Sequence, residues 1–224
     1  MALYEELVSK LNQLSDSDYA AFHIRLLNNP KINVIGVRTP VLRKLAKEYK
    51  DRFNELLTLP DKYYEVTFLK LIVASKLPFE EFTNVVDRCV DLIDNWACCD
   101  CFKAVCIQRH KEEFLPFVKA YLGVNSEFYQ RYALVTLLQF YVEEGYLDLI
   151  FESVERADTS YYYVHMAVAW LVAEVLIKHF EKGKEYLKLN RLDRATHNKA
   201  IAKACESYRI TKEQKTQLKG LKRP

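Results

Sequence analysis

Glycine and proline are scarce in this sequence, with five glycines and six prolines among 224 residues. Sheets joined by tight turns use these residues at most of their turns, so the scarcity argues against a β-rich fold. No apolar run reaches the roughly 18 residues that a membrane-spanning helix needs. The sequence opens on an amphipathic segment without a signal-peptide pattern, and we therefore expect a cytoplasmic protein that does not act at a membrane.

Several motifs of metal and nucleophile chemistry are also missing. Cys98 and Cys101 form a C-x-x-C, but no second cysteine pair at zinc-site spacing accompanies them. The strand–helix context of a thioredoxin-like site is absent as well. The five histidines show no ligand spacing, and there is no phosphate-binding glycine loop and no serine-nucleophile motif. We therefore expect buried thiols rather than a metal or redox site.

What the sequence does contain is helical periodicity. Apolar residues recur every three to four positions in several segments, for example over residues 41–49, 66–73 and 134–141. Capping residues and prolines delimit about twelve helices, among them one from Asp94 or Asn95 to about Arg109 and a break at Gly183. Helix pairs recur every 35 to 45 residues or so, which is the period of HEAT-type repeats.

This pattern predicts an all-α fold, a right-handed curved solenoid of about six HEAT-like helix pairs that forms a single domain over residues 1–224. A compact irregular helix bundle is the structural alternative. We expect the protein to be a monomer.

Charge is distributed unevenly along the chain. Residues 178–224 contain 14 Lys/Arg and 5 Asp/Glu, whereas residues 1–177 contain 19 Lys/Arg and 25 Asp/Glu. A solvated, lysine-rich terminal helix pair would explain the basic end. Contact with a polyanion such as nucleic acid would explain it equally well.

Trp96 and Asp100 are the most informative pair, because residues four apart share one face of a helix. A tryptophan beside a carboxylate indicates a helix face that meets something other than a plain core. The alternative is a partly buried tryptophan whose indole N–H bonds a neighbour, with Asp100 serving as a cap or ion-pair partner.

Three further features occur in a fixed order around that pair: the loop Ile35-Gly36-Val37-Arg38-Thr39-Pro40 and its continuation to Lys47, Arg131 within Tyr129–Ala133, and Trp170. Together with Trp96 and Asp100, they resemble the HEAT-like-repeat DNA alkylation repair glycosylases over about residues 20 to 210. That family removes N3- and N7-alkylated purines from double-stranded DNA without rotating the base into a pocket, and it uses no metal or cofactor.

The resemblance implies roles for individual residues. Trp96, Asp100, Arg131 and Trp170 would line a concave surface around the damaged nucleotide, with Asp100 stabilising positive charge on the sugar and positioning water. Contacts to DNA would come from five further residues: Arg38, Arg43, Lys44, Lys47 and His165. His165 precedes Trp170 in a segment where the family tends to be basic, and residues 101–150 contain five Lys/Arg and six Asp/Glu. A non-catalytic HEAT-like scaffold for a protein or an unusual nucleic-acid structure is the second hypothesis, and a plain DNA-binding module is the third.

Overall fold

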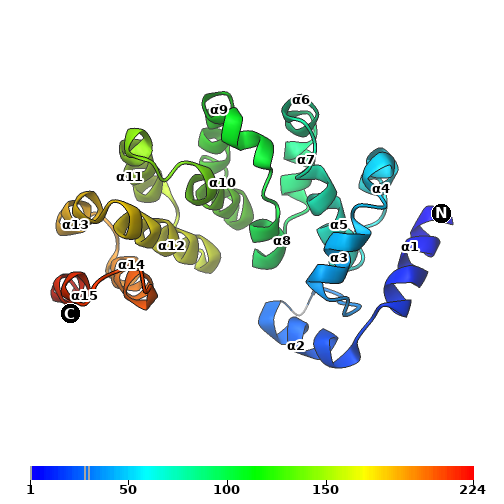
Figure 1. Ribbon diagram of the computed structural model, residues 1–224, viewed down its shortest axis with the longest axis horizontal. Coiled ribbons are helices and arrows are strands. Elements are labelled where there is room, and N and C mark those ends of the chain that lie inside the picture. Colours follow the sequence, from blue (N-terminus) through cyan, green and yellow to red (C-terminus); the bar gives the residue numbers. More distant parts are fainter. Residues whose placement is uncertain (1, 28, 30) are drawn as a thin grey trace. The chain divides into compact units, whose positions relative to one another are not determined.

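The computed structural model describes residues 2–27, 29 and 31–224 (Figure 1). These residues form fifteen α-helices and three short 3-10 helices, and no strand occurs among them, so the all-α prediction is confirmed. Across the described ranges, no helix is both long and apolar enough to cross a bilayer. The chain divides into two compact units, Met1–Ile107 and Gln108–Pro224.

The first unit is organised around one fully buried helix, α5. Its helices are α1 (Ala2–Gln13), α2 (Ser17–Leu27), α3 (Thr39–Leu45), α4 (Phe53–Leu57), α5 (Tyr64–Ala74), α6 (Phe79–Thr83), α7 (Val86–Asp91) and α8 (Trp96–Cys101). All eleven residues of α5 are buried, and it packs against α3, α4, α7 and α8. Burial on every side explains why α5 is mostly apolar rather than striped, although Glu65, Thr67 and Lys70 are buried within it as well.

A buried carboxylate attaches the loop before α3 to this central helix. Glu65 of α5 is fully buried and accepts hydrogen bonds from the backbone N–H groups of Ile35 (3.0 Å), Gly36 (2.7 Å) and Val37 (3.2 Å). Gly36 has φ = +103°, and a Cβ there would lie 2.5 Å from the carbonyl oxygen of Asp16. The loop can therefore lie directly against the start of α2 only because this residue is glycine.

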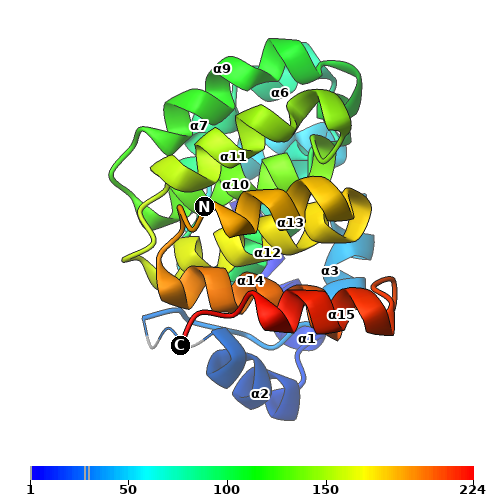
Figure 2. The same ribbon diagram turned by 90° about the vertical axis from the view of Figure 1, so that its left-hand side faces the viewer.

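The second unit consists of two layers of helices (Figures 1 and 2). Its helices are α9 (Lys111–Leu122), α10 (Glu127–Phe140), α11 (Leu147–Arg156), α12 (Tyr162–Lys178), α13 (Phe180–Lys188), α14 (Arg194–Glu206) and α15 (Lys212–Gly220). One layer contains α10, α12 and α14, and the other contains α9, α11, α13 and α15. In the first layer α12 packs against both neighbours, α10 and α14. The alternation of layers agrees with the predicted helix pairs. The single domain stays a prediction, as do the curvature and the handedness of a solenoid.

Two predicted boundaries are wrong. The helix expected to reach Arg109 ends at Cys101, and a separate 3-10 helix covers Val105–Arg109. The backbone leaves helical geometry at Phe102, which has φ = −77° and ψ = 61°, and both Phe102 and Ala104 beyond it are buried. Gly183 does not break the chain but lies inside α13, where a Cβ would come within 2.9 Å of the Leu176 side chain. Glycine there permits close packing of α13 on α12.

Candidate functional site

The short helix α8 carries Trp96 and Asp100 in the first unit. Asn95 caps it, since its side-chain oxygen accepts a hydrogen bond from the backbone N–H of Cys98 at 2.8 Å. Cys98 and Cys99 are buried, on the side where α8 packs against α5, whereas Trp96 and Asp100 are half-buried. The helix thus presents the two residues on its outer side, as their spacing predicts.

The Trp96 indole is held by α2. Its Nε1 donates a hydrogen bond to the backbone carbonyl oxygen of Leu26, in the last turn of that helix, at 3.2 Å. An indole has one N–H donor, so this bond occupies its polar edge and leaves the ring faces for packing. The alternative hypothesis for Trp96, a partly buried tryptophan whose indole N–H bonds a neighbour, predicts such a bond. The same bond fixes the orientation of the ring next to Asp100.

Two cysteines of α8, Cys98 and Cys101, favour the protonated thiol over the reactive thiolate. Burial raises the pKa of both the Cys98 and the Cys101 thiol far above the usual range, and Cys101 Sγ donates to the Cys98 carbonyl oxygen at 3.1 Å. A thiol that stays protonated is neither a good nucleophile nor a metal ligand. Among the described residues, no group of three His, Cys, Asp or Glu side chains is placed to hold a metal ion.

Arg131 is buried in the second unit, where it secures the start of α12. Its Nη1 donates to the carbonyl oxygen of Tyr163 at 2.9 Å, and its guanidinium carbon lies 5.7 Å from the centre of the Tyr163 ring. One turn earlier on α10, Glu127 accepts a hydrogen bond from the backbone N–H of Tyr163 at 2.7 Å. Arg131 therefore has a structural role in joining α10 to α12, whatever else it contacts.

Trp170 lies further along α12, and 38% of it is exposed. It follows Tyr163 by seven residues, which is close to two helical turns, so both rings lie on the same side of α12 at roughly 10 Å along its axis. Arg131 thus contacts Tyr163 at the start of α12, and Trp170 lies about two turns further along the same helix.

His165 is oriented by a chain of hydrogen bonds to a carboxylate. Its Nδ1 lies 2.7 Å from Oγ1 of Thr196, and that hydroxyl donates its only proton to Asp193. Nδ1 must therefore be the protonated nitrogen and the donor to Thr196, which leaves Nε2 to other contacts. Burial opposes ionisation of Asp193, but hydrogen bonds from Thr196 and Thr159 outweigh it and hold the pKa of this carboxyl below its usual value.

The basic residues predicted to contact DNA do not form one cluster. Arg38 makes two hydrogen bonds to the Asp16 carboxylate, at 2.7 and 3.1 Å. Lys44 lines a hollow together with the Lys10–Glu48 ion pair. Arg43 and Lys47 line a different hollow, whose other cations the sequence analysis did not single out.

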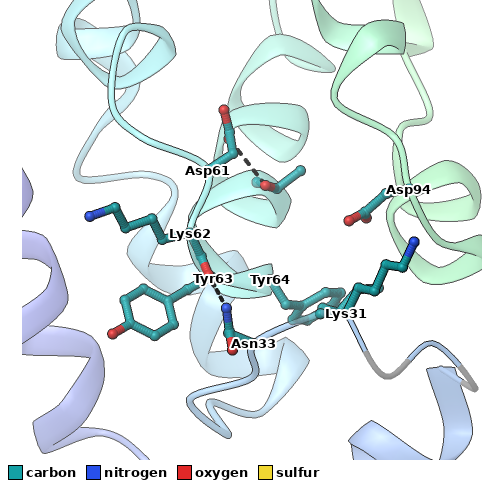
Figure 3. Close-up of a pocket in the computed structure, with 9 residues that line it drawn as sticks. Lys31, Asn33, Asp61, Lys62, Tyr63, Tyr64 and Asp94 are labelled. Atoms are coloured by element: carbon teal, nitrogen blue, oxygen red, sulfur yellow. Dashed lines mark hydrogen bonds between the residues drawn. The ribbon is translucent and has the colours of Figure 1, made fainter.

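A further hollow of about 330 Å³ lies beside the segment that leads into α8 (Figure 3). Asn33 donates to the Lys62 carbonyl oxygen at 3.1 Å on one side, and the amino end of Lys31 points towards the loop of Asp94 on the other. The lining contains two lysines and two aspartates, so it has no net charge. Sequence reasoning missed this hollow, since its residues come from three loops and the start of α5 and share no motif.

The chain matches a known family over most of its length. The family model described as DNA alkylation repair enzyme covers residues 7–206, a range that includes α8 with Trp96 and Asp100, Arg131, and α12 with Trp170. No curated protein matches the chain.

Proposed function

This chain belongs to the family of DNA alkylation repair enzymes, and on that basis we propose that it is a DNA glycosylase. Its substrate is double-stranded DNA that contains cationic N3- or N7-alkylpurines. It hydrolyses their N-glycosidic bond without rotating the base out of the duplex, as a cytoplasmic monomer without a cofactor. The observation that carries this proposal is the Trp96–Asp100 pair on the outer side of a capped helix, with the indole held by Leu26.

The proposed reaction needs a carboxylate but no general acid. An alkylated purine already carries a positive charge, so when the C1′–N bond breaks its electron pair neutralises the departing base. Positive charge then develops on the deoxyribose, and the Asp100 carboxylate stabilises it electrostatically. Water adds to C1′ and loses a proton, and in this proposal Asp100 accepts that proton. No protonation of the leaving group is needed.

The aromatic and basic residues have supporting roles in this proposal. The faces of the Trp96 ring pack against the sugar–phosphate backbone and attract the positive charge that develops on the deoxyribose. Trp170, in the second unit, has the same proposed role. Arg131 contributes its positive charge towards a phosphate while its Nη1 stays bonded to Tyr163. Arg38, Arg43, Lys44, Lys47 and His165 belong to the proposed DNA-contacting set.

The test is release of N7-methylguanine or N3-methyladenine from alkylated duplex DNA at low salt. We expect release by the wild-type protein and a rate lower by about a hundredfold or more for Asp100→Asn, since one preorganised charge-stabilising group is lost. Asp51→Asn is the matched control, because Asp51 is an exposed aspartate of the 3-10 helix Lys50–Arg52 in the same unit. Its rate should equal that of the wild type.

Two outcomes count against the proposal in different ways. Absence of release by the wild-type protein would overturn the glycosylase activity. Equal release by the wild type and Asp100→Asn would remove Asp100 from the mechanism and leave the activity standing.

A non-catalytic scaffold of the same family is the second candidate. It is favoured by the engagement of two of the proposed DNA-contacting arginines in protein contacts, Arg131 with Tyr163 and Arg38 with Asp16. A scaffold of this kind should release no base, and it should not bind duplex DNA even at low ionic strength. Tight, salt-sensitive binding to duplex DNA would argue against it.

A further inference from the structure

Three hollows of the first unit differ in the charge of the residues that line them. The hollow of Figure 3 has two lysines and two aspartates. The hollow at Lys44 includes Lys10 and Glu48, which pair with each other at 2.5 Å. The third hollow has four cations and no carboxylate, and we call these four residues and their surroundings the basic hollow: Arg43, Lys47, Lys50 and Lys76.

The basic hollow has an apolar floor beneath its charged rim. Its volume is about 240 Å³, and its floor consists of Ala46 from the turn after α3 together with Ile72 and Val73 from α5. All four cations are exposed, and no carboxylate in the described part of the chain pairs with any of them. The volume is below the roughly 300–1,000 Å³ of pockets that engulf a small molecule, so it suits a segment of a longer ligand.

Helix ends account for only part of this cluster. Arg43 lies in the last turn of α3 and Lys76 follows the end of α5, where the helix dipole favours a cation. The dipole acts within the last turn, and Lys47 and Lys50 lie beyond α3. Gathering four like charges without a carboxylate is unfavourable, and an anion bound among them would relieve it.

The basic hollow is connected to the helix that carries Asp100. The central helix α5 packs against both α3 and α8. Burial raises the pKa of the Cys101 thiol and the positive charge of Arg43 works in the opposite direction, in keeping with a position of Arg43 near the residue next to Asp100. A polyanion held in the hollow would therefore lie near α8.

We propose that the basic hollow binds the sugar–phosphate backbone of duplex DNA, whether or not the DNA is damaged. The four cations contact phosphate oxygens, and the apolar floor contacts the carbon face of a deoxyribose. Lys50 and Lys76 thereby become DNA-binding residues. The inference rests on the proposed function for the choice of DNA as the polyanion, and it deepens that function by locating a lesion-independent contact.

The experiment compares two double variants with the same change in net charge. Lys50→Gln/Lys76→Gln alters the basic hollow, and Lys10→Gln/Arg52→Gln alters two cations of the same unit that pair with Glu48 and Glu55. Affinity for an undamaged duplex is measured by fluorescence anisotropy over a series of salt concentrations. Thermal unfolding of each variant is recorded alongside.

The slope of log K against log salt reports how many phosphates are neutralised, at about 0.9 for each. For Lys50→Gln/Lys76→Gln we expect the slope to fall by about 1.8 and the affinity at low salt to fall roughly tenfold, with unchanged thermal unfolding. The control should keep the wild-type slope.

Two results would overturn the proposal. Equal changes of slope in both double variants would show a response to net charge alone. A lower unfolding temperature with an unchanged slope would show that Lys50 and Lys76 serve the helix ends. Base release is measured separately, so a wild type that binds through the hollow but releases no base would refute the glycosylase activity and leave this inference intact.

Discussion

Trp96 in the first unit is held by a single backbone carbonyl of α2, whereas Arg131 in the second unit is buried between two long helices, α10 and α12. The position of Trp96 thus depends on where α2 lies. That position depends in turn on Gly36 and on the loop that Glu65 attaches to α5. In the first unit, a series of hydrogen bonds and close contacts determines the position of Trp96. In the second unit, packing between the core helices α10 and α12 determines the position of Arg131. Substitutions far from Trp96 and Arg131 should therefore affect the two units differently.

The largest effect should come from Glu65→Ala, at the start of that series. Removing the carboxylate leaves three N–H groups without their acceptor, two of them buried and one partly buried. At about 1–3 kcal/mol for each unsatisfied group, we expect a loss of about 3 kcal/mol or more in the free energy of unfolding. Urea denaturation measures this. Glu80→Ala, an exposed glutamate in the first turn of α6, is the control and should change little. Equal losses in both variants would show that Glu65 does not hold the loop.

Arg131→Met tests the corresponding contact of the second unit. Methionine fills much of the same space but loses the charge-assisted hydrogen bond to the Tyr163 carbonyl, for which we expect a loss of about 2 kcal/mol. Faster hydrogen exchange at the start of α12 should accompany it. Arg156→Met is the matched control, because Arg156 is exposed and pairs only with Glu152 of its own helix among the described residues. A loss no larger than that of the control would contradict a structural role for Arg131.

Acidification should weaken the first unit through His23. This side chain of α2 is buried between the Tyr19 and Tyr64 rings, neither ring nitrogen has a hydrogen-bond partner among the described residues, and burial lowers the pKa of the imidazole. The folded state takes up a proton less readily than the unfolded state, so the stability contributed by neutral His23 is complete above about pH 6.5 and is lost as the pH falls below it.

Between pH 7.5 and 5.5 we expect the free energy of unfolding to fall by about 1 kcal/mol more in the wild type than in His23→Phe, which keeps the ring contacts without a titrating group. Urea denaturation at both pH values gives the comparison. The same pH dependence in both proteins would rule out His23 as the source.

The smallest effect should come from Trp96→Phe, at the end of the series. Phenylalanine keeps an aromatic ring but cannot donate to Leu26, and a partly exposed bond of this kind contributes about 0.5–1 kcal/mol. Hydrogen exchange at the end of α2 should report the loss. Trp170→Phe is the reference, since no acceptor among the described residues bonds the Trp170 indole and its stability should hardly change. Identical behaviour of the two variants would show that the Leu26 bond does not hold α2 and α8 together.

The sequence pattern predicts structure well where all the residues that form the pattern lie within one helix. Apolar periodicity and scarce glycine were enough to predict an all-α chain, and the four-residue spacing was enough to place Trp96 and Asp100 on one side of α8. The prediction that this helix reaches Arg109 is wrong, because the backbone leaves helical geometry at Phe102, and the local pattern does not reveal that Phe102 and Ala104 are buried in the core. Gly183 was misjudged for a similar reason, since its neighbour Leu176 is on another helix.

Secondary structure and the order of the candidate residues thus follow from local periodicity, because they depend on residues within one or two helical turns. Contacts between distant segments could come only from the packed chain: Glu65 with the loop at Gly36, the Trp96 indole with Leu26, and Arg43 and Lys47 with Lys76 around one hollow. Each of these contacts joins residues about 30 or more positions apart. A buried glutamate or a lysine without a carboxylate partner looks ordinary until packing removes the water around it or brings other cations beside it.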